Sequence, residues 1–378
     1  MRSLILKNGD IYDPLTKERR KGSLGIRDGR IVPEDQITAA DGDVIDVSGY
    51  MVVPGFIDYH IHLYTGCDGG VSPDAISLPT GVTTAVDGGT CGVSTFEQFK
   101  RSDIDSSITN VLSYLHVSSA GLSTAAYPEN ADPKGFEREK IIALFKKYPY
   151  ILKALKVRMS KHIIGPLGLT REPLEKAIEI AEEVGCPVVV HVTDPVIPQE
   201  ELVSMLRPGD VFCHMYQGQG DTIIDGGGHV KREILRARER GVIFDASNGR
   251  GNFSFDVACP AIRDGFLPDI ISSDISPVTF YKQPAVSLPR LMSKYLAFGL
   301  ELTQVIDMVT INPARQLGDE ELGTLKNGTA ADVAVVRVID KPMRYYDLNQ
   351  KSIAGERLLV PQMTIKDGEI VYCSPGFN

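Results

Sequence analysis

Short apolar runs alternate with amphipathic helical segments through the middle of the chain, from Val53 to about Asp274. The runs are rich in β-branched residues and almost continuously hydrophobic, which is typical of strands buried on both faces of a parallel sheet. Eight runs are expected to be strands: VVPGFID, VTTAVDG, NVLSYLHV, ILKALKV, CPVVVH, DVFCH, GVIFDA and DIISSD. Eight strand-helix units of this size predict an α/β fold, a (β/α)8 TIM barrel. An open doubly wound sheet is the alternative, because periodicity does not show closure.

Two of the intervening segments have a clear helical period. GFEREKIIALFKKY and TREPLEKAIEIAEEVG place apolar residues at spacings of three and four. We expect the second helix to begin near Thr170 and to end at Gly185, because these residue types are favoured at helix caps.

Both ends of the chain have a different pattern, with short alternating segments broken by turn dipeptides. GSLGIRDGRIV and MTIKDGEIVY contain the hairpin signals Asp28-Gly29 and Asp367-Gly368. The similarity of IRDGRIV to IKDGEIV suggests that both termini contribute strands to one small β domain. We therefore expect residues 1–52 and 321–378 to form a small β-sandwich, and residues 53–320 to form a barrel inserted in it.

Composition and charge narrow the class of protein. Hydrophobic residues make up 43% of the 378 residues and charged residues 24%, the balance of a globular chain. No run approaches the roughly 20 apolar residues of a membrane span, and no signal peptide is recognisable, so we expect a cytoplasmic protein without a membrane partner. A net charge of −9 leaves no basic stripe for nucleic acid.

Histidines and an aspartate follow several predicted strands at the point where each strand ends. His60 and His62 end the first strand in PGFIDYHIH, and residues two apart on a strand point to the same face. His191 follows the fifth strand, His214 the sixth and Asp274 the eighth. Because active sites of such barrels lie at the carboxyl ends of the strands, we expect these side chains to meet there.

Imidazole nitrogens and a carboxylate suit zinc, manganese or iron as metal-ligand donors. The six cysteines have no C-x-x-C spacing and indicate neither a thiolate zinc site nor a disulfide framework. A single histidine at a strand end is more often structural. Four histidines and an aspartate at one level of a barrel favour a metal site.

A lysine in the fourth run is a further candidate ligand. An ammonium group has no lone pair for a metal, but a neutral lysine can capture carbon dioxide as a carbamate whose two oxygens bridge two cations. Lys153 and Lys156 compete for this role. They face opposite sides of a strand, and Lys156 lies nearer its carboxyl end, so we favour Lys156. A lysine snorkelling out of the barrel rim is the alternative.

These motifs resemble the amidohydrolase superfamily of metal-dependent hydrolases over nearly the whole chain. PGFIDYHIH is similar to the metal motif of the first strand, and TINPARQLG followed by GTLKNGTAADVAVV to the segment joining barrel and β domain. GVTTAVDGGTCG, LKVRMS, GDVFCHMYQG and FDASNGRGNFSFDVACPAIRDGFLPDIISSDI are similar to a dihydroorotase-like deacetylase group within the superfamily.

The resemblance implies a site for two zinc ions. His60, His62 and Asp274 would hold the more buried ion, His191 and His214 the more exposed one, and carboxylated Lys156 would bridge them. Two cations sharing a water would generate hydroxide that attacks an acyl bond, with Asp274 transferring its proton to the leaving group. The resemblance also implies a homo-oligomer.

Candidate substrate contacts lie near the same strand ends. Arg158 is two residues beyond Lys156, where its guanidinium could clamp a carboxylate; a structural ion pair is an equal alternative. Glycine-rich loops after the sixth and seventh strands allow close approach to a ligand, or are simply flexible turns. The positions singled out there are Tyr216, Asn248, Gly251, Asn252 and Phe253.

The combined features predict a binuclear zinc hydrolase that removes an acyl group such as acetyl from a small carboxylate-bearing amide or ester. The alternatives are hydrolysis of a cyclic amide, as in dihydroorotase or hydantoinase, deamination of a purine, and a binding protein that has lost catalysis. No G-x-S-x-G element supports a serine nucleophile.

Overall fold

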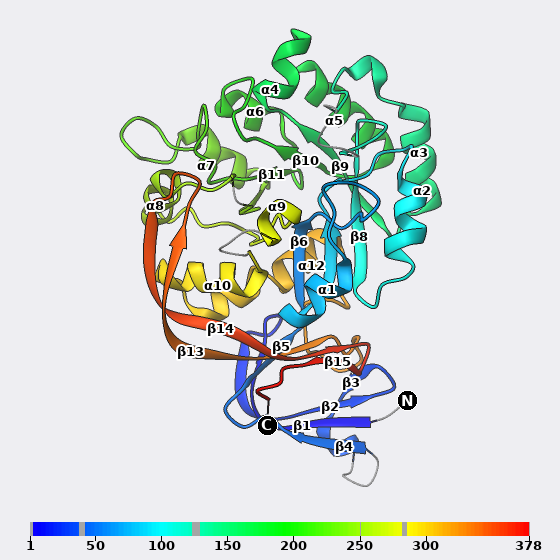
Figure 1. Ribbon diagram of the computed structural model, residues 1–378, viewed down its shortest axis with the longest axis vertical. Coiled ribbons are helices and arrows are strands. Elements are labelled where there is room, and N and C mark those ends of the chain that lie inside the picture. Colours follow the sequence, from blue (N-terminus) through cyan, green and yellow to red (C-terminus); the bar gives the residue numbers. More distant parts are fainter. Residues whose placement is uncertain (1–2, 38–41, 123–128, 250, 282–285, 378) are drawn as a thin grey trace.

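The computed structural model describes residues 3–37, 42–122, 129–249, 251–281 and 286–377. The described strands form two sheets, one of seven strands and one of eight. Figure 1 shows the seven-stranded sheet curled among helices and the larger sheet beside it, close to both termini. Within the described residues, no helix has the length and apolarity needed to cross a bilayer.

The seven-stranded sheet is entirely parallel and runs in the order β12-β11-β10-β9-β8-β7-β6. Its strands are β6 (Phe56–Ile61), β7 (Val82–Asp87), β8 (Asn110–His116), β9 (Leu152–Arg158), β10 (Val188–His191), β11 (Val211–Cys213) and β12 (Ile243–Asp245). Most of their residues are buried on both faces, which accounts for the continuous apolar runs. Six of the eight predicted strands are confirmed with nearly their predicted bounds.

The first predicted strand, VVPGFID, is divided between the two sheets. β5 (Met51–Pro54) pairs with the larger sheet, and β6 starts the parallel sheet at Phe56. The chain crosses between the sheets at Gly55, where a Cβ atom would lie 2.2 Å from Thr83 Oγ1. The close approach therefore requires glycine at this position.

The eighth predicted strand, DIISSD, does not form a regular strand. It makes one parallel bridge, between Ile270 and Asp245 of β12. On its other side, Asp274 N donates to His60 O at 2.7 Å, so hydrogen bonds join the segment to both edges of the curled sheet. The ladder is interrupted because the Ser273 amide binds the Asp58 carboxylate instead of a strand, and because Asp274 has a φ of 51°.

The eight-stranded sheet combines strands from both ends of the chain, in the order β15-β14-β13-β5-β1-β2-β3 with β4 beside β1. Its other strands are β1 (Ser3–Asp13), β2 (Glu18–Arg27), β3 (Arg30–Val32), β4 (Gly42–Asp46), β13 (Val333–Tyr346), β14 (Ser352–Lys366) and β15 (Glu369–Cys373). The two predicted hairpins are confirmed, since Asp28-Gly29 joins β2 to β3 and Asp367-Gly368 joins β14 to β15. All four turn residues have positive φ, as a type I′ turn requires. The strands form one hydrogen-bonded sheet, so the two-layered sandwich stays a prediction.

Helices flank the parallel sheet in Figure 1. They are α1 (Pro73–Ser77), α2 (Phe96–Phe99), α3 (Arg138–Lys147), α4 (Lys161–Ile164), α5 (Glu172–Val184), α6 (Gln199–Met205), α7 (Arg232–Glu239), α8 (Phe255–Arg263), α9 (Pro277–Phe280), α10 (Leu288–Ala297), α11 (Leu302–Asp307) and α12 (Ile311–Leu317). Short 3-10 turns cover Glu34–Gln36, Leu78–Thr80, Pro133–Gly135 and Gly165–Leu167, and a π-helical turn covers Lys100–Ile104.

The two predicted helices correspond to α3 and α5. Gly185 ends α5 with a left-handed φ of 79°, as expected. Its start was predicted one residue early, because Arg171 rather than Thr170 precedes the first helical residue.

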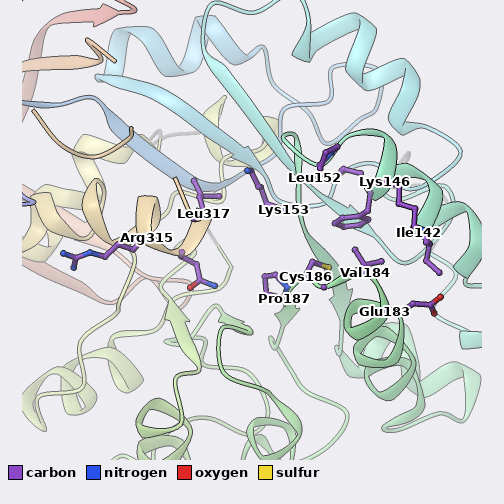
Figure 2. A pocket seen from close by; sticks show the side chains of 15 residues that line it. Ile142, Lys146, Leu152, Lys153, Glu183, Val184, Cys186, Pro187, Arg315 and Leu317 are labelled. Carbon is purple, nitrogen blue, oxygen red and sulfur yellow. The ribbon is translucent and has the colours of Figure 1, made fainter. Parts of the chain in front are cut away.

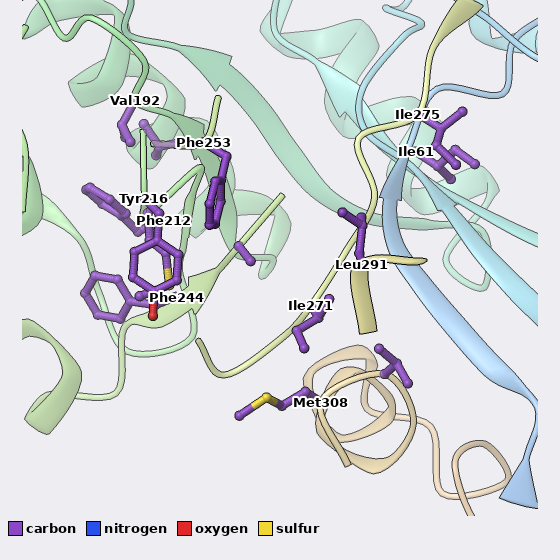
Figure 3. Packing of buried hydrophobic residues seen from close by; sticks show 14 of the residues in the cluster. Ile61, Val192, Phe212, Tyr216, Phe244, Phe253, Ile271, Ile275, Leu291 and Met308 are labelled. Carbon is purple, nitrogen blue, oxygen red and sulfur yellow. The ribbon is translucent and has the colours of Figure 1, made fainter. Parts of the chain in front are cut away.

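The apolar core lies between the sheet and its helices. Figure 3 shows Phe212, Tyr216, Phe244 and Phe253 packed in one group, with Ile271 and other aliphatic side chains nearby. Burial of such a side chain stabilises the fold by roughly 1.5–3 kcal/mol. The core thus supports the strand ends from which the candidate site is built.

Candidate metal centre

The first strand brings two histidines to one place, as the spacing predicted. His60 lies in β6 and His62 directly follows it, and their ring centroids are 5.7 Å apart. Asp274 lies against both rings, with its Oδ1 3.2 Å from His62 Nε2 and 3.8 Å from His60 Nε2. These three residues offer ligand atoms that all lie within 4.8 Å of one another.

The two histidines from later strands lie at the same end of the sheet. His191 ends β10, His214 follows β11, and their ring centroids are 4.3 Å apart. The His214 ring is 5.4 Å from the His60 ring, and its Nδ1 is 4.0 Å from Asp274 Oδ2. Four histidines and the aspartate therefore converge, although they come from four separate segments of the chain.

Lys156 joins this group, whereas Lys153 does not. Lys156 is 2% exposed, and its Nζ lies 3.4 Å from His60 Nε2 and 3.7 Å from Cys213 Sγ. Figure 2 shows Lys153 in a different pocket of about 540 Å³, beside Leu152 and Pro187 at the amino ends of β9 and β10. The two lysines thus lie toward opposite ends of β9, and only Lys156 faces the histidines.

Hydrogen bonds fix which nitrogen of His62 carries a proton. The Thr90 hydroxyl donates to Asp87 Oδ2 at 2.7 Å, so it can only accept from His62 Nδ1, also at 2.7 Å. A neutral His62 therefore has a bare Nε2 facing the Asp274 carboxylate. Two acceptors at this distance need a cation between them, either a second proton on His62 or a metal ion.

The His60 ring is oriented in the same way. The Ser247 hydroxyl donates to Asp245 and therefore accepts from His60 Nδ1, which is 3.1 Å away. The bare Nε2 of His60 then faces Asp274 and Lys156. For His214, Nδ1 donates to the Ser247 carbonyl at 2.7 Å, which leaves Nε2 available as a ligand.

Burial keeps His60, His191 and His214 neutral. It lowers the pKa of His60 and His191 well below the usual range and that of His214 to about 3, with neighbouring cationic groups adding to the effect for His60 and His191. Burial alone would raise the pKa of Asp274, but His62, His214 and His60 hold it well below its usual value. Neutral imidazoles beside an ionised carboxylate are the protonation states that a divalent metal requires.

Three non-glycine residues of the site have left-handed backbone conformations. The φ angles are 60° for His214, 35° for Ser247 and 51° for Asp274. Such conformations are costly for residues with a Cβ and cluster at functional sites. At these positions the chain turns sharply after the sheet, which directs the polar side chains toward one point.

Arg158 forms the ion pair that was the alternative to substrate binding. Its Nη1 lies 2.5 Å from Glu129 Oε2, and Glu129 Oε1 is 3.4 Å from His116 Nε2. Burial acts to raise the pKa of Glu129, but His116 and Arg158 outweigh it and lower the pKa to about 2. The side chain of Arg158 is still 22% exposed. The ion pair therefore does not occupy all of the guanidinium.

Of the loop positions that the sequence indicated, Asn252 contacts the candidate metal ligand Asp274. Its Nδ2 donates to Asp274 Oδ2 at 2.9 Å, and its Oδ1 accepts from the Thr193 hydroxyl. The others have internal partners. The Tyr216 hydroxyl donates to Phe266 O, Gly251 O accepts from Gln219, Phe253 packs on Tyr216, and Asn248 accepts from Lys294.

Several residues that orient the histidines were missed from the sequence: Asp87, Thr90, Cys213, Asp245 and Ser247. The rule of strand ends could have found three of them, since Asp87, Cys213 and Asp245 are the last residues of β7, β11 and β12. Cys213 and Asp245 also form a second possible ligand group with His60. That group fits a metal less well, because burial raises the pKa of Cys213 to about 12 and Asp245 already accepts from Ser247 and Ser272.

Known proteins are similar to this chain over nearly its whole length. Residues 51–371 match the amidohydrolase family. A deacetylase from Agrobacterium fabrum is 30% identical over 351 residues, 92% of this chain and 86% of that protein. A deacetylase from Enterococcus faecalis is 28% identical, covering 97% of this chain and 98% of its own.

Solved structures agree with the sequence relatives. An adenine deaminase has a TM-score of 0.90 and 27% identity, covering 99% of this chain and 100% of that chain. A dihydroorotase has a TM-score of 0.88 and 27% identity, covering 99% and 98%. The family match covers far more than half of the sequence, and the chain therefore belongs to the amidohydrolase family.

Proposed function

We propose that this chain is a binuclear zinc hydrolase that removes an acetyl or similar acyl group from a small carboxylate-bearing amide or ester. The observation that carries the proposal is the bare Nε2 of His62 facing the Asp274 carboxylate at 3.2 Å. A cation between these two atoms would turn a repulsive contact into a ligand pair. The buried side chain of Lys156 beside His60 supports a second ion nearby.

The placement of the side chains supports a ligand set for each ion. His60, His62 and Asp274 would hold one ion, His191 and His214 the other, and Lys156 would bridge them as a carbamate. Within the described residues, no carboxylate lies within 4.0 Å of Lys156 Nζ to balance an ammonium charge. Conversion to a carbamate would remove that buried positive charge and supply two oxygen donors.

When bound, two divalent ions would lower the pKa of a water molecule and polarise the carbonyl of the substrate. Asp274 would accept the proton of the attacking water and deliver it to the leaving nitrogen or oxygen. Asn252 would hold Oδ2 of Asp274 through its amide donor during this transfer. The hydroxyl groups of Thr90 and Ser247 would keep the imidazoles of His62 and His60 in the correct tautomer.

Arg158 would recognise the carboxylate of the substrate. Only its Nη1 contacts Glu129 in the hydrogen bonds of the described chain, and a guanidinium has five donors in a planar fork. The partly exposed edge of the guanidinium could therefore still bind an anion near His191, which lies opposite Arg158 in the β9-β10 register.

The proposal also includes a homo-oligomer located in the cytoplasm. Analytical ultracentrifugation of the purified protein would measure its oligomeric state.

The deacetylase reaction is favoured because relatives of that name match over more than four fifths of both chains. Hydrolysis of a cyclic amide is the second candidate, supported by the high TM-score with a dihydroorotase. Purine deamination is a third, supported by the similarity to an adenine deaminase.

A substrate panel tests the proposal. Protein supplied with zinc and bicarbonate would be assayed with N-acetyl amino acids, O-acetyl hydroxy acids, dihydroorotate and adenine, with Asp274→Asn as the background. We expect release of acetate. Turnover of dihydroorotate or adenine alone would contradict the deacetylase, and an inactive protein holding less than one ion per chain would favour a binding protein.

A further inference from the structure

The segment that follows β12 touches three of the candidate metal ligands. We call it the β12 loop; it is described at residues 247–249 and 251–253. Ser247 contacts His214 through its carbonyl and His60 through its hydroxyl, and Asn252 donates to Asp274. Gly249 lies so close that a Cβ atom would be 2.4 Å from Asp274 Oδ2. A small displacement of this loop would therefore move both nitrogen and oxygen donors of the site.

A buried lysine outside the metal centre holds this loop at two points. Lys294 of α10 is 4% exposed, its Nζ donates to Asn248 Oδ1 at 2.5 Å, and it lies 3.4 Å from the centroid of the Phe253 ring. Asn248 and Phe253 stand at either end of the β12 loop. The Lys294 amine thus contacts the β12 loop on both sides of Asn252.

The environment of Lys294 is unusual for a lysine that serves only stability. Within the described residues, no carboxylate lies within ion-pair distance of its Nζ, and its nearest polar partner is the neutral amide of Asn248. Burial lowers the pKa of Lys294 well below its usual range. Placing an amine here is unfavourable relative to a methionine of similar shape, which indicates that the amine has another role.

The larger sheet reaches the same loop from outside. The hairpin of β13 and β14 extends toward α8 in Figure 1. At its tip, Leu348 N donates to Phe253 O at 3.1 Å, and Asp347 Oδ2 accepts from Phe255 N at 2.9 Å. The far end of the β12 loop is therefore held between α10 and this hairpin.

We infer that Lys294 is a positioning residue for the metal centre: by binding Asn248 and the Phe253 ring, it fixes the β12 loop and thereby the rings of His60 and His214 and the carboxylate of Asp274. The inference rests on the proposed metal-dependent function for its catalytic consequence. Its structural consequence, a fixed β12 loop, does not depend on bound metal.

The test compares Lys294→Met with wild-type protein in three measurements. Hydrogen exchange of the metal-free proteins should show faster exchange at the amides of Asn248 and Gly249, while the strands of the larger sheet keep their protection. Zinc should be lost to a chelator faster, and its affinity should fall about 10–100-fold, the range expected when the groups that orient metal ligands are disturbed. In the active enzyme kcat should fall by a similar factor, with a smaller change in KM.

Lys366→Met is the matched control, since Lys366 is also buried but pairs with Asp332 in the larger sheet. It should lower the melting temperature without changing exchange in the β12 loop or the affinity for zinc. Asn248→Ala removes the acceptor of the same hydrogen bond and should produce the same change of exchange in the β12 loop as Lys294→Met. It therefore tests the inference even if Lys294→Met folds poorly.

Unchanged exchange at the amide of residue 249 in both Lys294→Met and Asn248→Ala would overturn the inference. So would an equal rise in exchange throughout the protein, because it would mean that Lys294 acts on global stability only. If wild-type protein binds no zinc and turns over no substrate, the proposed function fails, but the exchange experiment still decides the role of Lys294.

Discussion

At the scale of single residues, hydrogen bonds determine which ring nitrogen of each histidine carries a proton. Asp87 makes Thr90 an acceptor, and Asp245 does the same for Ser247, so the neutral forms of His62 and His60 each have a bare Nε2. Each buried carboxylate thus sets the tautomer of an imidazole through two successive hydrogen bonds that share one hydroxyl group. The sequence pointed to the histidines but not to Thr90 and Ser247, because hydroxyl residues have no distinctive spacing.

Asp274→Asn tests the proton transfer. The amide is nearly the same size and keeps an oxygen donor, but it cannot accept a proton, so we expect kcat to fall about 10²–10⁴-fold while part of the bound metal is retained. Steady-state kinetics and metal analysis of the same sample would measure both. Activity close to that of wild-type protein would show that another group is the base.

Lys156→Met and Lys153→Met form a matched pair on one strand. Loss of Lys156 removes the bridging position beside His60, so we expect loss of metal and of nearly all activity. Loss of Lys153 changes only the pocket at the amino ends of the strands (Figure 2), and kcat should stay within about twofold. Metal content and activity of both variants decide which lysine bridges the ions. Equal losses in the two variants would contradict the assignment of Lys156.

At the scale of elements, the turns after the strands matter more than the strands themselves. The positions of β7 to β12 could be predicted because buried parallel strands leave continuous apolar runs. The irregular path of DIISSD could not, since it depends on the carboxylate of Asp58, which lies 215 residues away in sequence from Ser273. The left-handed φ angles of His214, Ser247 and Asp274 likewise arise from tertiary contacts and not from local propensity.

Gly249→Ala tests how tightly the β12 loop fits against the site. Gly249 has a φ of 48° and no room for a Cβ beside Asp274 Oδ2, so we expect a fall in kcat of at least about tenfold through displacement of Asp274. Gly299→Ala is the control, with a φ of 91° but open space around the new Cβ.

The control should cost about 1 kcal/mol of stability and leave kcat unchanged. Chemical denaturation and kinetics of both variants separate strain from displacement. If Gly299→Ala lowers kcat as much as Gly249→Ala, the loss would reflect stability and not the geometry of the site.

At the scale of the whole molecule, one sheet supplies the site and the other supports it. Strands from both termini form the larger sheet, as the matching hairpin motifs predicted, and its β13-β14 hairpin reaches the β12 loop. That contact was not predictable, because a long hairpin between distant elements leaves no local signal. The division at Gly55 was missed for a similar reason, as β5 and β6 share one apolar run.

The stability of the molecule at acid pH should depend on Glu129. Its pKa falls from 4.5 to about 2 on folding, so its ionised form stabilises the protein above pH 4.5 and this contribution is lost as the pH falls from 4.5 toward 2. The linked free energy is on the order of 3 kcal/mol. Glu129→Gln should therefore be less stable at neutral pH and lose less stability on acidification.

Denaturant titrations at pH 7 and pH 3 would measure this difference. Glu321→Gln removes an ion pair with Arg30 in which both side chains are about half exposed, and it should behave like wild-type protein. Parallel stability curves for wild-type and Glu129→Gln proteins would contradict the assigned role of the buried carboxylate.

The proposed chemistry requires that donors from separate strand ends meet around two metal ions. The most direct test is diffraction from crystals grown with zinc and bicarbonate, recorded on both sides of the zinc absorption edge. We expect two anomalous peaks per chain, one contacting His60, His62 and Asp274 and one contacting His191 and His214, with extra density on Lys156 Nζ between them. A zinc-loaded crystal with no peak among these residues, or with the ions held elsewhere, would contradict the account.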